Sequence, residues 1–173
     1  GLLMSYVKHL GIFKSDKLDS SRSYLSKQLA GEKVPINTDQ WDGYPLEREK
    51  FYEVISQSQS NVILAGDSHN AWFSNLYDEK NEFKGIEVGA PAISSPSLGD
   101  SLGELTEVVE KAFVDENKDL MWMNGRHKGY VSMNITEEYI DVSFKFISTV
   151  KSQQYDLLEP YQFRVEHNKP YSA

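Results

Sequence analysis

The chain has 173 residues, 39% of them hydrophobic, and a formal net charge of −8. This size and apolar content suffice for one sizeable core, so we expect a single domain or part of one. The sequence has no run of about eighteen apolar residues that would predict a membrane-spanning helix. Its first residues also lack the pattern of a signal peptide, so we expect a soluble chain. Because the sequence begins with glycine instead of methionine, we expect a trimmed protein or a piece of a longer one.

Composition also excludes several kinds of site. The sequence contains no cysteine, which rules out disulfides, cysteine-ligated zinc and cysteine nucleophiles. The acidic balance disfavours a nucleic acid as the default partner, because a phosphate backbone attracts clusters of Lys and Arg. Any metal site must therefore use oxygen and nitrogen ligands.

The first sixty residues predict helices without a chemical signature. Two short helices are expected over residues 2–10 and 22–29. A turn-rich block follows at residues 39–45 (DQWDGYP), whose Pro45 suits the first position of a helix. In that helix Phe51, Val54 and Ile55 have the spacing of a buried stripe. We expect the aromatic residues of the turn, Trp41 and Tyr44, to support packing.

The next segment combines a short apolar run with a turn that can carry chemistry. Val62–Ala65 predicts a buried strand, and the chain leaves its carboxyl end through Gly66, Asp67, Ser68 and His69. Open α/β sheets usually bind ligands at this end of their strands, and Gly66 is expected to permit the sharp turn. Asp67 and His69 offer an oxygen and an imidazole nitrogen to a single metal or phosphate site.

The rest of the chain predicts a mixture of strands and helices. The expected elements are a short helix over residues 71–76, a strand over 83–88, a loop over 89–103, a helix over 105–113, and strands over 120–123, 129–135 and 139–147. The last two strands predict a hairpin, in which Val142, Phe144 and Phe146 alternate on a buried face.

A basic patch, Arg126-His127-Lys128, precedes the hairpin. Arg offers a planar fork that matches phosphate oxygens, which makes Arg126 and His127 candidate substrate contacts. A solvated turn is the equally good alternative, because charged residues at the entrance to a hairpin are normally exposed.

Five blocks follow one another in an order that is typical of a known family. They are residues 39–45 (DQWDGYP), the Arg48-containing helix, residues 66–69 (GDSH) with Trp72 after them, residues 87–96 and residues 122–130. In this order they resemble the carboxyl-terminal half of PhoD-like phosphatases, the alkaline phosphatase D type of metallophosphoesterase. The resemblance covers residues 33–150. WDGYP and GDxH are fairly specific together, although each is weak alone.

The resemblance implies an α/β fold, part of a metallophosphoesterase-type sandwich of two sheets flanked by helices (α-β-β-α). It also implies a periplasmic or extracellular hydrolase of phosphomonoesters or phosphodiesters that uses iron and calcium, other divalent metals being possible. Such metals activate water and neutralise charge on the phosphoryl oxygens. Asp67 and His69 match the family's GDxH pair, which implies that both are metal ligands and catalytic residues.

The family's amino-terminal ligands do not occur in this sequence. They lie on GDxxY-like and DDHE-like turns, and neither motif is present. Two ligands cannot complete a catalytic cluster that takes about four or more groups per metal. We therefore expect the chain to supply part of the metal site, with the remainder of the catalytic domain upstream, and to be inactive alone.

Two alternatives of different kinds stay open. A strand followed by Gly-Asp-Ser also begins SGNH or GDSL esterases, with Ser68 as nucleophile, and a literal GDSL occurs at residues 99–102. The Asp-x-x-His of those enzymes is missing, however, and a serine without a base is a weak nucleophile. The other alternative is a noncatalytic domain that binds a protein or a small anion.

Overall fold

The computed structural model describes residues 41–58 and 60–172. Residues 41–51 belong to one unit of the chain, and residues 52–58 and 60–172 belong to a second. The helices predicted over residues 2–10 and 22–29 lie outside the described residues. Both sheets and the turn at residues 66–69 belong to the second unit. None of the helices in the described part of the chain has the length and hydropathy needed to cross a bilayer.

The described chain begins with a 3₁₀ turn, Trp41–Gly43, and helix α3, Pro45–Ile55. The Trp41 ring stacks on Phe51 with 5.4 Å between ring centroids, yet Trp41 remains 52% exposed. The predicted helix is confirmed, but the predicted stripe is wrong, because Val54 is 66% exposed and Tyr52 is the buried residue. Three apolar residues near the end of a short helix are too few to decide which face is covered.

Sheet A contains four strands in the order β1-β3-β2-β4. Their bounds are Val62–Ala65 for β1, Phe83–Gly89 for β3, Ala71–Tyr77 for β2 and Leu120–Asn124 for β4. Strand β1 is parallel to β3, whereas β2 is antiparallel to both β3 and β4. The strands predicted over residues 62–65, 83–88 and 120–123 are thus confirmed.

Two expectations for sheet A are wrong. Strand β1 was expected to be buried, but it lies at the edge of the sheet and Leu64 is 67% exposed. The helix predicted over residues 71–76 is the inner strand β2, in which Ala71, Phe73 and Asn75 point to a buried face. Hydrogen-bonded neighbours on both sides satisfy the backbone of β2, and this pairing overrides a weak local preference for helix.

Sheet B contains three strands in the order β5-β6-β7. Strands β5, Lys128–Ile135, and β6, Tyr139–Ile147, form the predicted hairpin with Val131 opposite Phe144. Val142, Phe144 and Phe146 are buried as predicted. Strand β7, Tyr161–Glu166, was not predicted, because its polar outward residues leave only Phe163 and Val165 as an apolar signal.

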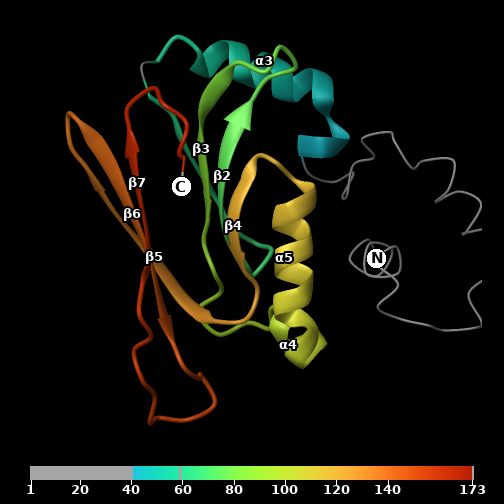
Figure 1. Cartoon of the computed structure of the whole chain (residues 1–173), viewed down its shortest axis with the longest axis vertical. Helices are drawn as coiled ribbons and strands as arrows, with labels where there is room; N and C mark the ends of the chain where they lie inside the picture. Colours follow the sequence, from blue (N-terminus) through green and yellow to red (C-terminus); the bar gives the residue numbers. More distant parts are fainter. Residues whose placement is uncertain (1–40, 59, 173) are drawn as a thin grey trace, which may run out of the picture. The chain divides into compact units, whose positions relative to one another are not determined.

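The two sheets pack face to face through one aromatic core (Figure 1). Phe73 of β2 stacks on Phe163 of β7 with 4.3 Å between centroids, and Trp122 of β4 lies 4.7 Å from Phe144 of β6. The expected α/β architecture with two sheets is therefore confirmed. The rings share this core with aliphatic side chains such as Ile86, Val88 and Val142, and each ring buries a large area.

Helices cover the side of sheet A that faces away from sheet B. Helix α5, Thr106–Glu116, packs on β4 and confirms the helix predicted over residues 105–113. A short helix α4, Leu98–Leu102, and a 3₁₀ turn, Gly103–Leu105, occupy the end of the predicted loop. The rest of that loop, residues 90–97, crosses the carboxyl edge of sheet A.

We expect Phe73→Ala to lower the free energy of unfolding by about 3–5 kcal/mol, because it leaves a cavity between the sheets. Urea denaturation of the 173-residue chain measures this change. Leu64→Ala is the control and should alter stability by no more than about 0.5 kcal/mol, since Leu64 is largely exposed. Equal losses in the two variants would contradict this description of the core.

Candidate active site

Three connections of sheet A meet at one edge because of the strand directions. Ala65 at the end of β1 lies opposite Gly89 at the end of β3, and Ala71 at the start of β2 lies opposite Asn124 at the end of β4. The turn at residues 66–70, the loop at residues 90–97 and the turn at residues 125–127 therefore come together. The carboxyl edge of an α/β sheet is where ligands usually bind.

Asp67 and His69 hold an uncommon backbone conformation in the first of these turns. Their φ angles are +64° and +63°, in the left-handed region that non-glycine residues seldom occupy. Ser68 N–H closes the turn with a hydrogen bond of 2.7 Å to Gly66 O. Gly66, which we expected to permit the sharp turn, has no positive φ. The two candidate ligands adopt the left-handed conformation instead. Strained residues of this kind tend to cluster at functional sites.

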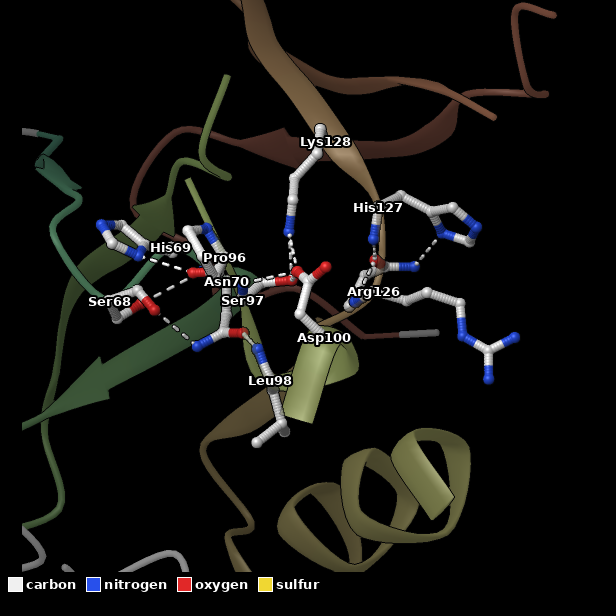
Figure 2. Close-up of polar contacts among 11 residues, drawn as sticks. Ser68, His69, Asn70, Pro96, Ser97, Leu98, Asp100, Arg126, His127 and Lys128 are labelled. Carbon is white, nitrogen blue, oxygen red and sulfur yellow. Dashed lines mark hydrogen bonds and ion pairs between the residues drawn. The ribbon is translucent and has the colours of Figure 1, made fainter. Parts of the chain in front are cut away.

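The ring of His69 is held in one orientation by the backbone. Its Nδ1 lies 2.7 Å from Pro96 O, in the loop that follows β3 (Figure 2). A carbonyl oxygen can only accept, so Nδ1 carries the proton of the neutral ring and Nε2 keeps a free lone pair. Histidines that bind metals commonly donate their other nitrogen to a carbonyl or carboxylate in this way.

Asp67 lies two residues from His69, and its side chain belongs to an exposed residue. A carboxylate and an imidazole suit iron, and the carboxylate also suits calcium. Among residues 41–58 and 60–172, no group of three or more Asp, Glu or His side chains is arranged to hold a metal ion. Asp67 and His69 are therefore candidate donors that do not form a complete metal site with other described residues.

Asn70 links the turn to helix α4, a role that the sequence did not reveal. Its Nδ2 donates to Ser68 O at 2.7 Å, and its Oδ1 accepts from Leu98 N–H at 3.1 Å. One side chain thus satisfies backbone groups on two segments that are far apart in sequence. An Asn after a turn has no local signal for such a partner.

Lys128 is buried at the start of β5 and pairs with Asp100 of α4. Its Nζ donates to Asp100 Oδ2 at 2.8 Å and to Ser97 Oγ at 2.5 Å. The hydrogen bond from Lys128, together with that from Ser97 N–H, lowers the pKa of Asp100 to about 2. Asp100 is therefore ionised at neutral pH and neutralises the buried ammonium group.

The structure separates the three basic residues that were expected to form one patch (Figure 2). Arg126 turns away, donating from Nη2 to Gly103 O at 3.2 Å and lying 3.9 Å from Glu107. His127 lies beside Asn124 Nδ2 at 3.1 Å, and burial lowers its pKa. Each of the three side chains therefore has a different partner, although all three line the same hollow.

A hollow on the described part of the second unit borders this region. Arg126, His127 and Lys128 line a hollow of about 210 Å³ together with residues 147–151. A second hollow of about 240 Å³ is lined by Asn61, Lys84 and Gly85, at the opposite end of β3 from the turn that carries His69. Position and chemistry both favour the first as the neighbour of the candidate site.

Gly89 belongs to the site because it makes room for Trp72. A Cβ atom at Gly89 would lie 2.1 Å from Cδ2 of the Trp72 ring, which lies opposite it across β2 and β3. Only glycine is compatible with this contact. The ring thus covers the end of β3, next to the point where the loop at residues 90–97 begins.

The geometry does not support Ser68 as an esterase nucleophile. Ser68 Oγ accepts from Asn70 N–H at 3.3 Å, and no histidine within the described ranges hydrogen-bonds to it. His69 Nδ1 is already committed to Pro96 O. The literal GDSL at residues 99–102 lies in α4 instead of following a strand, and its Asp100 is paired with Lys128.

Comparison with known proteins agrees with this arrangement. The model of the PhoD-like phosphatase family matches residues 13–144, which is most of the chain. The chain belongs to the PhoD-like phosphatase family. It is also 29% identical over 100 residues to alkaline phosphatase D of Bacillus subtilis (strain 168), a match that covers 57% of this chain and 17% of the relative. No solved structure matched the chain.

Backbone strain at Asp67 gives a test that does not depend on activity. Asp67→Gly should be more stable than Asp67→Ala by about 1–2 kcal/mol, because glycine adopts a positive φ without steric cost. Urea denaturation of both variants measures the difference. Ser68→Gly and Ser68→Ala are the matched pair, and their order should be reversed because Ser68 has no positive φ. The same order at both positions would contradict the description of the turn.

The ion pair of Asp100 predicts a loss of stability in acid. The pKa of Asp100 is about 2 in the folded chain and about 3.9 in an unfolded one. As the pH falls, Asp100 is therefore protonated at a lower pH in the folded state than in the unfolded state. Its contribution is complete above about pH 4 and disappears as the pH falls towards about 2. Urea midpoints of the chain and of Asp100→Asn should therefore converge on acidification. Parallel curves through this pH range would show that the ion pair adds nothing.

Proposed function

We propose that this chain is part of a metal-dependent phosphate-ester hydrolase, to which it supplies two metal ligands, the carboxylate of Asp67 and Nε2 of His69. One observation carries the proposal. The hydrogen bond from His69 Nδ1–H to Pro96 O leaves Nε2 with a free lone pair at the ligand-binding edge of sheet A. Membership in the PhoD-like family supports the reaction class.

The donor set supports iron and calcium as the metals, with other divalent ions as alternatives. Asp67 contributes a negative charge and a hard oxygen, and His69 contributes a neutral nitrogen. When bound, such ions polarise the phosphate ester and neutralise charge on its oxygens. They also offset the chain's net charge of −8, which would otherwise repel an anionic substrate.

The residues of this chain have separable tasks in the proposed reaction. Pro96 O fixes the tautomer of His69, and Asn70 holds the turn against the start of α4. Arg126 and His127 are proposed as substrate contacts on the wall of the adjacent hollow. Arg126 already donates from Nη2 to Gly103 O and has fewer N–H groups left for a phosphate, which makes it a weaker candidate than the two ligands.

We further propose that the chain is the carboxyl-terminal half of a PhoD-like catalytic domain and is inactive alone. The match to the Bacillus subtilis protein covers 17% of that relative, which leaves ample length for further ligands. The described residues contain two suitable donors and no group of three. A metal held by two protein ligands lacks the coordination that catalytic sites require.

Hydrolysis of a chromogenic phosphodiester and a phosphomonoester tests the proposal. The 173-residue chain and the full-length protein are each assayed with iron and calcium. We expect the full-length protein to hydrolyse these esters and the 173-residue chain not to. In the full-length protein, Asp67→Ala or His69→Ala should reduce turnover at least about 100-fold, since loss of a ligand removes charge and geometry from the metal site.

His167→Ala is the matched control. His167 Nε2 also lies 2.8 Å from a backbone carbonyl, Thr136 O, but at the far end of β5 from Lys128. Its variant should retain full activity. Full activity in Asp67→Ala and His69→Ala would remove the site assignment, and turnover by the short chain would show that the site is complete within it.

A further inference from the structure

Lys128 is an unexpected residue to find buried beside the candidate site. It is 6% exposed, and lysine is almost never buried unless it is paired. Burial of an ammonium group carries a desolvation cost that its partners must offset. Both partners of Lys128, Ser97 Oγ and Asp100 Oδ2, lie at the start of helix α4. The lysine therefore contacts the start of this helix through two residues.

Asp100 Oδ2 is the point where three donors meet. It accepts from Lys128 Nζ at 2.8 Å, from Ser97 N–H at 2.8 Å and from Ser97 Oγ at 3.3 Å. Charge-assisted hydrogen bonds of this kind are stronger than neutral ones. The bond from Ser97 N–H has the greatest consequence, because it acts on the peptide unit that joins Pro96 to Ser97.

That peptide unit connects Asp100 to His69. The carbonyl of Pro96 and the N–H of Ser97 belong to one planar group and point in opposite directions. On one side Ser97 N–H donates to Asp100, and on the other side Pro96 O accepts from His69 Nδ1 at 2.7 Å. Fixing one side of the plane fixes the other. Figure 2 shows Lys128, Asp100, Ser97, Pro96 and His69 in this sequence.

We propose that Lys128 and Asp100 are positioning residues for His69, acting through the Pro96–Ser97 peptide. Asp100 holds the peptide plane so that the Pro96 carbonyl faces His69, and Lys128 holds Asp100. The consequence is that His69 keeps its proton on Nδ1 and presents Nε2. The inference rests on the proposed function in one respect only, namely that Nε2 binds a metal.

Other hydrogen bonds to α4 do not involve the Pro96–Ser97 peptide, which Asp100 restrains. Asn70 Oδ1 accepts from Leu98 N–H at 3.1 Å, and Gly125 O accepts from Gly99 N–H at 2.7 Å. These bonds hold the two following residues of the helix and would keep α4 in place in a variant. Rotation of the Pro96–Ser97 peptide is restrained at Ser97 N–H by Asp100, so a loss of Asp100 should affect His69 without unfolding the helix.

The tautomer of His69 tests the inference directly. The chain, labelled with ¹⁵N in its histidines, is studied by NMR at about pH 8, where imidazole is neutral. Resonances of His69 are assigned with His69→Gln. We expect the Nδ1–H tautomer to dominate in the unaltered chain. In Asp100→Ala and Lys128→Met the Nε2–H tautomer should become the larger population.

Lys84→Met is the matched control for Lys128→Met. The Lys84 side chain is 12% exposed and pairs with Asp78 and Glu82, at the opposite end of β3 from Gly89. This variant also loses an ion-paired lysine, but it should leave the His69 tautomer unchanged. If Lys128→Met does not fold, Asp100→Ala decides the question, since Asp100 is a third exposed. An unchanged Nδ1–H population in folded Asp100→Ala would overturn the inference.

The tautomer experiment and the hydrolysis assay can fail independently of each other. The tautomer is measured on this chain without metal or substrate, whereas hydrolysis is measured on the full-length protein. A tautomer change in Asp100→Ala supports the positioning role even if His69→Ala retains hydrolysis, and that second result would count against the proposed function alone.

Discussion

Parallel pairing of β1 with β3 is the constraint on which the candidate site depends. It places the carboxyl ends of the two strands side by side, so that the turn carrying Asp67 and His69 lies next to the loop that ends at Pro96. Strand β2 returns between β3 and β4 and brings Asn124 to the same edge. The hydrogen bond from His69 to Pro96 spans 27 residues of sequence, and it exists because this pairing closes the distance.

The packing of the two sheets makes that edge rigid. Phe73 and Trp122 of sheet A contact Phe144 and Phe163 of sheet B, so the strands that carry the site are fixed from behind by rings. Asn75 adds a polar tie, exchanging two hydrogen bonds with the backbone of Tyr171. A rigid support of this kind allows the turn above it to keep two residues in a strained conformation.

Two features at this edge of sheet A lower the stability of the fold locally. Asp67 and His69 hold positive φ angles at a cost that glycine would avoid. Lys128 is buried with its charge, at a desolvation cost that a methionine would avoid. Neither feature is needed for a two-sheet fold. In the function proposed for this chain, both features serve to present His69 Nε2 in one orientation.

The family, the GDSH turn and most of the strands could be predicted from the sequence alone. WDGYP followed by GDxH identified the family that the family model confirms, and the alternation of Val142, Phe144 and Phe146 predicted a buried face correctly. Such patterns are local, and side-chain spacing of two or of three to four residues records them directly.

The roles of residues with distant partners follow from the tertiary fold. Residues 71–77 form an inner strand instead of a helix, because pairing on both sides outweighs local preference. The tertiary fold divides the basic patch, committing Lys128 to Asp100 and turning Arg126 towards Gly103. It also supplies Pro96 O as the partner of His69. A backbone carbonyl carries no sequence signal, so this contact follows from the fold alone.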